Sequence, residues 1–335
     1  MKQSLLWIAL LLITGLFGCR EEDETILTET PISFPSDFPE IEYSNEETPF
    51  TKDRILLGRH LFYDNDLSED HRISCGSCHA QVHGFADHNT PKSFGIHGRL
   101  GKRNAPAIVN VAWMKNFMWD GGIRNLDVMS IAPLTDSNEM GLTLKEVVRW
   151  VSQKEKYRQL FKNAYGSDSI DEYRILVSLT QFMLQLISDN SKYDRVRRGK
   201  ASFNSDEKAG YELFKVNCSS CHQEPLFTHH QFERNGVVQN QEDPGRYRIT
   251  QLEEDRGKFK VPTLRNIELT YPYMHDGSIL TLKDVIHGYN NVDRKLNPNV
   301  PYFRLDSIET NQIIAFLKTL TDYTFISKYE FAEIP

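Results

Sequence analysis

The stretch Cys75-Gly76-Ser77-Cys78-His79 occurs a second time, as Cys218-Ser219-Ser220-Cys221-His222, in this chain of 335 residues. Both copies have the Cys-x-x-Cys-His spacing that attaches a c-type haem. In such a site the cysteines form thioethers with the porphyrin and the histidine binds the iron. The spacing and its duplication predict two covalent haems c. The residues predicted to hold them are Cys75, Cys78, His79, Cys218, Cys221 and His222.

Two other uses of such cysteine pairs fit the sequence less well. A zinc site built from both pairs would span an interval of roughly 140 residues, far beyond the usual spacing of zinc ligands. A thioredoxin-like redox pair would lie at the start of a helix that follows a parallel strand, and the sequence shows no such context. Haem iron, in contrast, implies redox chemistry or electron transfer.

The N-terminus has the pattern of an export signal. Lys2 precedes an apolar run from Leu5 to Phe17, which is too short to span a bilayer but suits the core of a signal peptide. The run ends in Leu16-Phe17-Gly18-Cys19, which resembles the bacterial lipobox. Residues 1–18 are therefore predicted to be a lipoprotein signal peptide and Cys19 the lipidated residue; a buried N-terminal helix with an incidental cysteine is the alternative. We expect an exported protein, lipid-anchored on the periplasmic side of a bacterial membrane.

Charge and cysteine count limit the partners. Without residues 1–18 the chain has 38 basic and 46 acidic side chains, a net charge of −8, which disfavours nucleic acid. Acids cluster in Glu21-Glu22-Asp23-Glu24, and residues 19–48 predict an extended acidic tether between the lipid and the folded part. Four of the five cysteines belong to the haem motifs and the fifth is Cys19, so none is left for a disulfide.

A related phrase lies upstream of each haem motif. Residues 57–62 (Leu-Gly-Arg-His-Leu-Phe) and 209–214 (Ala-Gly-Tyr-Glu-Leu-Phe) each predict a short helix whose Leu-Phe pair can cover a haem face. The repeat predicts an all-α fold of two tandem class I cytochrome c-like domains, each with one covalent c-type haem. We place the N-terminal haem domain at residues 49–190 and the C-terminal one at 191–335.

Helical spacing of apolar residues predicts further helices. They cover residues 142–161, 169–187 and about 307–320, the last opened by Asp306 or Ser307 as a cap. Strand signals are weak and short. The pattern therefore favours a mostly helical chain.

Several phrases resemble the bacterial di-haem cytochrome c peroxidase family, which includes the related methylamine-utilisation di-haem enzymes. They occur in the family's order along most of the chain and comprise Leu57-Gly58, Leu61-Phe62-Tyr63-Asp64, Gly84-Phe85-Ala86-Asp87, Arg103-Asn104-Ala105-Pro106, Trp119-Asp120-Gly121, Pro133-Leu134, Glu139-Met140-Gly141, Phe259-Lys260-Val261-Pro262-Thr263-Leu264-Arg265-Asn266 and Pro272-Tyr273-Met274-His275-Asp276-Gly277. The resemblance implies an enzyme that reduces hydrogen peroxide to water with electrons from a small c-type cytochrome or cupredoxin. It also implies a homodimer.

The resemblance and the chemistry of the side chains assign one task, electron entry or peroxide binding, to each haem. Met274 lies where the family has the sixth ligand of its high-potential haem, and a thioether ligand raises the potential of haem iron. His222 and Met274 are therefore predicted to hold the electron-entry haem, and His79 the haem that binds peroxide. His97, in a glycine-rich loop, matches a histidine that in some relatives binds the distal side of the His79 haem in the resting state. A solvated loop histidine is an equal alternative.

Glu139 occupies the position of the family's catalytic glutamate. A carboxylate in an apolar haem pocket, with a raised pKa, can take the proton from one peroxide oxygen and give it to the other. The alternative is a solvated loop acid. Met129 stands where relatives commonly have a glutamine near this pocket, and a thioether cannot donate the hydrogen bond of an amide.

Trp119 matches the tryptophan that the family places between the haems, where its ring shortens the distance that an electron tunnels; a core aromatic is the alternative. By resemblance alone, a calcium ion is implied between the domains. Its ligands would be Asn104 and backbone carbonyls near Lys260 and Pro262, since oxygen ligands suit calcium.

Two other functions stay open from the sequence. One is an electron carrier in which both haems are six-coordinate, an option that Met129 keeps open. The other is a relative of the di-haem enzyme that matures a tryptophan-derived quinone in a protein substrate, where a tyrosine replaces the ligand methionine. Met274 argues against this second option.

Overall fold

The computed structural model describes residues 31–44, 48–87, 90–238, 242–295, 297–298 and 300–334. The predicted signal peptide 1–18, Cys19 and the first part of the predicted tether lie outside the described residues. No helix in the described part is long and apolar enough to cross a membrane. Below, the N-terminal half means residues 48–190, the C-terminal half residues 191–320, and the C-terminal tail residues 323–334.

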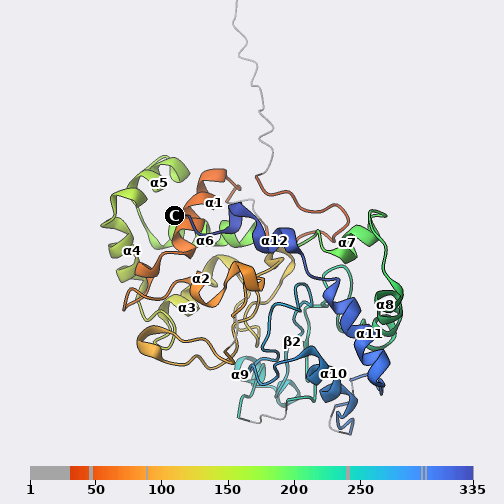
Figure 1. Ribbon diagram of the computed structural model, residues 1–335. Coiled ribbons are helices and arrows are strands. Elements are labelled where there is room, and N and C mark those ends of the chain that lie inside the picture. Colours follow the sequence, from red (N-terminus) through yellow and green to blue (C-terminus); the bar gives the residue numbers. More distant parts are fainter. Residues whose placement is uncertain are drawn as a thin grey trace, which may run out of the picture. The chain divides into compact units, whose positions relative to one another are not determined.

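The described chain is mostly helical, which confirms the predicted fold class (Figure 1). The α-helices are α1 (Lys52–Phe62), α2 (Cys75–Cys78), α3 (Ile131–Thr135), α4 (Leu144–Ser152), α5 (Glu155–Tyr165), α6 (Glu172–Leu184), α7 (Lys192–Arg197), α8 (Ser205–Asn217), α9 (Tyr247–Thr250), α10 (Leu282–Asn290), α11 (Ser307–Lys318) and α12 (Tyr323–Ser327). Short 3-10 turns cover Asn65–Leu67, Gln81–His83, Ile96–Gly98, Val111–Trp113, Leu126–Val128, Glu253–Asp255 and Tyr329–Phe331. Within the described residues there is one sheet, in which β1 (Phe232–Glu233) pairs antiparallel with β2 (Phe259–Lys260).

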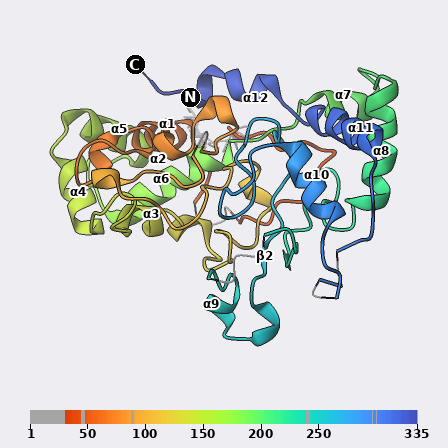
Figure 2. The same cartoon turned by 60° about the horizontal axis from the view of Figure 1, so that its bottom comes forward.

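Each half is built on one pair of crossing helices, α1 with α6 and α8 with α11 (Figures 1 and 2). A glycine lies at each crossing. A Cβ atom on Gly58 would lie 1.9 Å from the carbonyl oxygen of Ser178, and one on Gly210 would lie 1.8 Å from that of Gln312. The two phrases that predicted a duplicated helix therefore share a physical requirement, because only glycine lets the two backbones approach so closely.

The predicted helix over 142–161 is two helices instead, α4 and α5. The break falls at Lys154, which has an extended backbone and places its ammonium 2.9 Å from a carboxylate oxygen of Asp64. This tertiary ion pair was not visible in the apolar spacing. The other two predictions agree with α6 and α11, which begin after the capping residues Asp171 and Asp306.

The C-terminal tail packs on the N-terminal half. Phe325 and Phe331 belong to the same buried cluster as Phe85. Arg59 in α1 donates to the carbonyl of Ala332 at 2.6 Å, and the Tyr63 hydroxyl donates to that of Phe331 at 2.7 Å. The tail thereby ties the end of the chain to the region of the first haem motif. The boundaries at 49–190 and 191–335 stay a prediction.

Candidate functional site

In the first haem motif, a backbone carbonyl orients the histidine ring by a hydrogen bond. Cys75 begins α2, Cys78 ends it and His79 follows directly. The Nδ1 atom of His79 lies 3.0 Å from the carbonyl oxygen of Phe85. A hydrogen bond from Nδ1 leaves Nε2 as the ring nitrogen that can bind a metal. Burial lowers the pKa of His79, which keeps the imidazole neutral as a ligand must be.

The second motif repeats this geometry. Cys218 follows the last residue of α8, and Cys221 and His222 form the next turn. The Nδ1 atom of His222 lies 3.1 Å from the carbonyl oxygen of Phe227, and burial lowers the pKa of this histidine to about 4. Phe85 and Phe227 are both fully buried with positive φ values of 59° and 55°. Both histidines are therefore oriented in the same way.

The motif cysteines are unbridged thiols. Burial raises the pKa of Cys75 and of Cys218 to about 12, so neither is a thiolate at neutral pH. In the part of the chain that the structure describes, no three His, Cys, Asp or Glu side chains converge as a metal cluster. The cysteines fit covalent attachment to an apolar ring better than they fit a charged metal shell.

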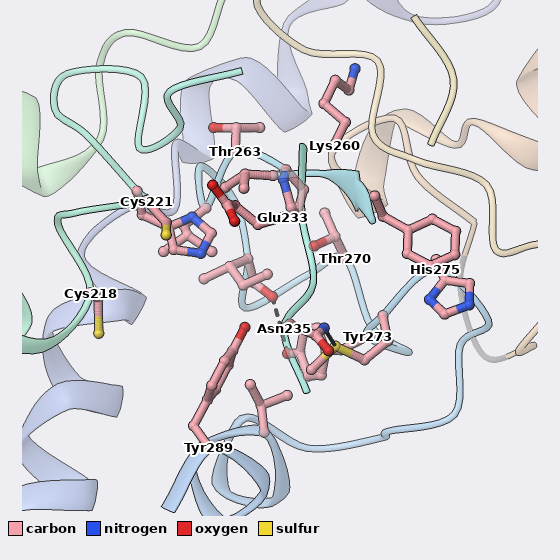
Figure 3. A pocket seen from close by; sticks show the side chains of 18 of the residues that line it. Cys218, Cys221, Glu233, Asn235, Lys260, Thr263, Thr270, Tyr273, His275 and Tyr289 are labelled. Atoms are coloured by element: carbon pink, nitrogen blue, oxygen red, sulfur yellow. Dashed lines mark hydrogen bonds between the residues drawn. The ribbon is translucent and has the colours of Figure 1, made fainter. Parts of the chain in front are cut away.

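A cavity of about 240 Å³ lies beside the second motif (Figure 3). Cys218 and Cys221 line one side and Tyr289 lies below them in the view. The lining is mostly apolar, and His222 is part of it. An apolar slot with two thiols and a neutral histidine at its wall has the donor set of a covalent haem c site.

Met274 lies in the wall of the same cavity as His222. It has a positive φ of 75°, in a turn that an isolated bridge between Tyr273 and Ile279 closes. Its sulfur accepts a hydrogen bond of 3.2 Å from Nδ2 of Asn235, drawn as a dashed line in Figure 3. The structure thus brings the predicted thioether and histidine to one cavity, and Asn235 orients the thioether.

Glu139 is half-buried, and its negative charge is felt by the cysteines of the first motif. Burial, followed by the charge of Asp136, raises the pKa of Glu139. The pKa values of Cys75 and Cys78 are raised mainly by burial. The charge of Glu139 is one of the smaller causes that raise them. The predicted proton carrier therefore lies within electrostatic range of the first motif, in an environment that favours its protonated form. Met129 is also half-buried and packs against the core of the N-terminal half.

The loop with His97 packs on the backbone of Glu139, but its imidazole points elsewhere. Ile96 donates to the carbonyl of Glu139 at 2.9 Å. The His97 side chain is about half exposed (49%), and its Nε2 lies 3.2 Å from a carboxylate oxygen of Glu69. In this conformation the structure does not bring His97 to the first motif. A positive φ of 55° makes the backbone at His97 unfavourable for a non-glycine residue.

Trp119 lies where the two halves meet. Its indole N–H donates to the carbonyl of Asn104 at 2.7 Å, and its own carbonyl accepts from the Lys260 amide at 2.7 Å. The indole lines the same cavity as His222, and its ring centroid is 6.5 Å from that of His275. Trp119 is therefore bonded to both halves beside the second motif.

Asn104 bridges the halves as well. Its amide N–H donates to the carbonyl of His275 at 2.8 Å, and its side chain donates to the carbonyl of Pro91 at 3.3 Å. Burial lowers the pKa of Lys260, whose ammonium donates to the carbonyl of Asn116 at 3.1 Å, to about 8. Asn104, Lys260 and Pro262, the residues named for calcium, all line the cavity beside the second motif.

Sequence reasoning missed a buried charge network at this junction. Asp120 is fully buried and accepts from Arg103 at 2.6 Å and from Arg248 at 2.7 Å. Arg103 also pairs with Asp243 at 2.7 Å. These partners are distant in sequence, and no local spacing signals them. Truncating one partner would leave an uncompensated buried charge, so the network fixes how the two segments meet.

Sequence reasoning also missed a second duplication that the sequence does carry. Residues 106–123 align without a gap on residues 262–279, and six positions are identical. The identical residues are Pro106, Asn110, Met118, Asp120, Gly121 and Ile123, matched by Pro262, Asn266, Met274, Asp276, Gly277 and Ile279. A constant offset of 156 residues is the signal that could have found it.

Comparison with known proteins agrees with this geometry. The family model described as di-haem cytochrome c peroxidase matches residues 52–202, and the cytochrome c model matches residues 207–321. The cytochrome c551 peroxidase of Nitrosomonas europaea is 37% identical over 282 residues, which cover 82% of this chain and 81% of the relative. The methylamine utilization protein MauG of Methylophilus methylotrophus is 32% identical over 280 residues, covering 81% and 83%.

Solved structures agree as well. The crystal structure of a MauG-like protein associated with microbial copper homeostasis superposes with a TM-score of 0.82 at 29% identity, covering 90% of this chain and 98% of that one. The diheme peroxidase BthA of Burkholderia thailandensis has the same fold, with a TM-score of 0.72 at 21% identity over 85% of this chain and 90% of that one. This chain, with two cytochrome c-like domains and hence two haems c, belongs to the di-haem cytochrome c peroxidase family.

Proposed function

We propose that this member of the family reduces hydrogen peroxide to water with electrons from a small redox protein, a c-type cytochrome or a cupredoxin. One observation carries the proposal: a half-buried acid, Glu139, lies within electrostatic range of the first haem motif, whereas a thioether, Met274, lines the cavity of the second. When bound, the haems supply one iron for peroxide and one iron for electron entry. The names of relatives, which include cytochrome c551 peroxidase, support this function.

We assign the covalent and proximal contacts to the two motifs. Cys75 and Cys78 hold the first porphyrin, and Cys218 and Cys221 hold the second. The Nε2 atom of each motif histidine would be the iron ligand, because each Nδ1 is bonded to a phenylalanine carbonyl. Such a bond fixes the ring orientation and makes the ligand nitrogen more basic.

Glu139 is the proton carrier of this proposal. Its carboxylate takes a proton from one oxygen of hydrogen peroxide and delivers it to the other, which leaves as water. Burial raises the pKa of Glu139, which makes it a better proton donor near neutral pH than a solvated glutamate. The tight contact of the residue 95–98 loop with the backbone of residues 138 and 139 holds the carboxyl in place.

Electrons enter at the C-terminal half and cross at Trp119. Met274 on the second iron would raise its potential and so favour acceptance of an electron. The ring of Trp119 donates to the Asn104 carbonyl and its backbone carbonyl accepts from the Lys260 amide, which supports an aromatic group between the halves.

The remaining assignments rest on the resemblance and on the sequence. They are lipidation at Cys19 with anchoring on the periplasmic side, a calcium ion at Asn104 and nearby carbonyls, a resting ligand role for His97, and a homodimer. For His97 to reach the first iron, its bond to Glu69 would have to break.

The alternatives predict different behaviour of the half-reduced protein. We would prepare the holoprotein with two haems, reduce the C-terminal haem with one electron equivalent, and record spectra with and without hydrogen peroxide. A peroxidase reoxidises and, with a reduced donor, turns over; fully oxidised protein turns over much more slowly. A carrier shows no reaction, and a protein-modifying relative reacts with peroxide but does not consume the reduced donor. Either result would overturn the proposal.

A further inference from the structure

We propose that Asn235 is a positioning residue for the C-terminal haem: its amide occupies one lone pair of the Met274 sulfur, so that only the other lone pair is left for the iron. The inference rests on the proposed function, because it takes Met274 as the sixth ligand of that haem. It goes further by naming the group that fixes how this ligand binds and that raises the potential at which electrons enter.

The amide of Asn235 is oriented by its own turn. Its Oδ1 atom accepts from the backbone N–H of Val237 at 2.9 Å and from that of Val238 at 3.4 Å. An amide side chain has one oxygen and one nitrogen, so with the oxygen engaged in the turn the nitrogen is the atom that faces the cavity. That nitrogen donates to Sδ of Met274 at 3.2 Å (Figure 3). Asn235 therefore meets the sulfur as a hydrogen-bond donor.

Close packing holds the turn that carries Asn235. Gly236 has a φ of 70°, and a Cβ atom there would lie 2.5 Å from Nδ2 of Asn297. A Cβ atom on Gly288 in α10 would lie 2.5 Å from a methyl group of Val237. Since neither glycine has room for a side chain, the turn fits tightly between two neighbouring segments. The position of the donor is thus set by the fold.

The donor and the acceptor are tied to the same small sheet. Strand β1 ends at Glu233, two residues before Asn235, and pairs with β2. The ring of Phe259 in β2 stacks on the imidazole of His275, the residue after Met274, with ring centroids 3.7 Å apart and an interplanar angle of 14°. Because one sheet supports both segments, the amide and the thioether keep their relative position.

A hydrogen bond to the Met274 sulfur has two effects on its use as a ligand. A thioether sulfur has two lone pairs, and ligation through one or the other gives the sulfur a different configuration. An N–H group on one lone pair selects the configuration in which the other faces the iron. The bond also withdraws electron density from the sulfur, which weakens its donation to ferric iron and so raises the potential. Hydrogen bonding around the axial ligands is one of the means by which a protein tunes a haem.

The test removes the donor in two ways. Asn235→Leu has nearly the size of wild type but lacks both the N–H and the turn acceptor. Asn235→Asp keeps an oxygen that can accept from Val237 and lacks only the N–H. The second variant also covers the case in which Asn235→Leu does not fold.

Two readouts on the holoprotein report the ligand directly. In the reduced protein, the proton NMR signal of an iron-bound methionine methyl group is shifted far upfield by the haem ring, and the pattern of the haem signals reports the configuration of the sulfur. Wild type should show one such methyl signal with one configuration, and both Asn235 variants should show two configurations or their average. At the midpoint potential of the wild-type second haem, the ratio of ferrous to ferric iron at that haem should fall roughly 2- to 10-fold, the range of one hydrogen bond.

The same two substitutions at Asn217 are the matched controls. Asn217 lines the same cavity, but its amide donates to the carbonyl of Leu213 at 2.7 Å. Asn217→Asp brings a negative charge to the cavity wall, so any fall in potential that it causes measures the effect of charge alone. Both Asn217 variants should keep one methyl signal with the wild-type configuration.

Three results would overturn the inference. One is a wild-type methyl signal and a wild-type potential in Asn235→Leu. Another is a single wild-type configuration in Asn235→Asp, because the turn rather than the donor would then fix the ligand. The third is a potential that falls as far in Asn217→Leu as in Asn235→Leu, because loss of any amide from the cavity would then explain the change.

Peroxide turnover of the half-reduced wild type is measured in parallel, so the two claims fail separately. A wild-type second haem without a ligand methyl signal overturns the inference at any rate of turnover. A methyl signal that depends on Asn235, in a protein without turnover, supports the inference and overturns the proposed function. Turnover with a methyl signal that is indifferent to Asn235 supports the function and overturns the inference.

Discussion

The N-terminal and C-terminal halves hold their haem motifs with the same devices but differ in what they place beyond the histidine. Both use a glycine at a helix crossing, a buried phenylalanine carbonyl on the histidine Nδ1, and a methionine turn of positive φ. Each half has a half-buried carboxyl near its motif: Glu139 in the N-terminal half, where burial raises its pKa, and Glu233 in the wall of the cavity that Cys221 and His222 line, 3.9 Å from Nε2 of His229. The C-terminal half adds an amide donor, Asn235, to the sulfur of Met274 in its methionine turn.

The shared scaffold orients the haem ligands in both halves, and a few added groups give the two sites different chemistry. An acid with a raised pKa suits an iron at which oxygen is protonated, whereas a thioether held in place by a hydrogen bond suits an iron that changes only its charge. Substituting the added groups, while the scaffold stays intact, tests whether they cause the difference between the halves.

The largest effect is expected from removing the acid of the N-terminal half. Glu139→Gln should lower peroxide turnover by on the order of 10²–10⁴-fold, the usual contribution of a positioned proton carrier, while both haems stay attached. The reason is that an amide has the size of the carboxyl but cannot exchange a proton. Steady-state rates with a reduced donor, together with the haem content of each preparation, measure this loss.

Glu155→Gln is the matched control for that variant. Glu155 is an exposed glutamate at the start of α5, far from any assigned role, so its turnover should equal that of wild type. Full activity of Glu139→Gln would show that the carboxyl is not the proton carrier and would remove the functional difference between the halves.

The next effect is expected from the ligand of the C-terminal half. Met274→His should lower the potential of the second haem by on the order of 100 mV, since the identity of the axial ligand is the main protein control on haem potential. Electron entry from the donor should slow accordingly, while the spectrum of the N-terminal haem stays unchanged. Potentiometric titration followed by absorbance of each haem gives both values. An unchanged potential would show that another group binds the second iron.

A smaller effect, on stability, tests whether the scaffold is truly shared. Gly58→Ala and Gly210→Ala each place a Cβ within 2 Å of a facing carbonyl oxygen, at 1.9 and 1.8 Å. Each should destabilise its half by about 1–3 kcal/mol, the usual cost of overpacking. Gly101→Ala is the control, because its Cβ would meet its nearest neighbour at an ordinary 3.6 Å. Chemical unfolding of the holoprotein, followed by haem absorbance, compares the three; similar losses at Gly58 and Gly210 support equivalent crossings, and a loss at only one contradicts them.

The sequence predicted those parts of the molecule that depend on local spacing. The Cys-x-x-Cys-His motifs, the duplicated Leu-Phe phrases and the apolar spacing of α6 and α11 each contain their own evidence within a few residues. The structure adds the reason for the glycines in the two phrases, which is the close approach of a second helix more than 100 residues away.

Features that depend on distant partners could not be predicted in this way. The division of residues 142–161 at Lys154 depends on Asp64, and the burial of Asp120 depends on arginines from both halves. The predicted roles of Glu139, Met274 and Trp119 came from family resemblance rather than from spacing, and the structure adds which groups lie near each. The bond between His97 and Glu69 joins two loops whose proximity no pattern signals.

The smallest effect concerns the pH dependence of stability, and its sign follows from the environment of Glu139. Burial and Asp136 raise the pKa of Glu139 in the folded protein above its ordinary value of 4.5. Between 4.5 and the folded value, the folded state binds more protons at this site than the unfolded state does. Stability therefore falls as pH rises through that window, and the cost is fully present above it. Glu139→Gln removes the cost, so the variant should gain on wild type by roughly one or two degrees of melting temperature near neutral pH and match it below pH 4.5. Melting curves of the two holoproteins across that range measure the difference, with Glu155→Gln parallel to wild type throughout. A variant less stable than wild type at neutral pH would show that the carboxylate is stabilised where it lies, and the N-terminal half would then lack the feature that separates it from the C-terminal half.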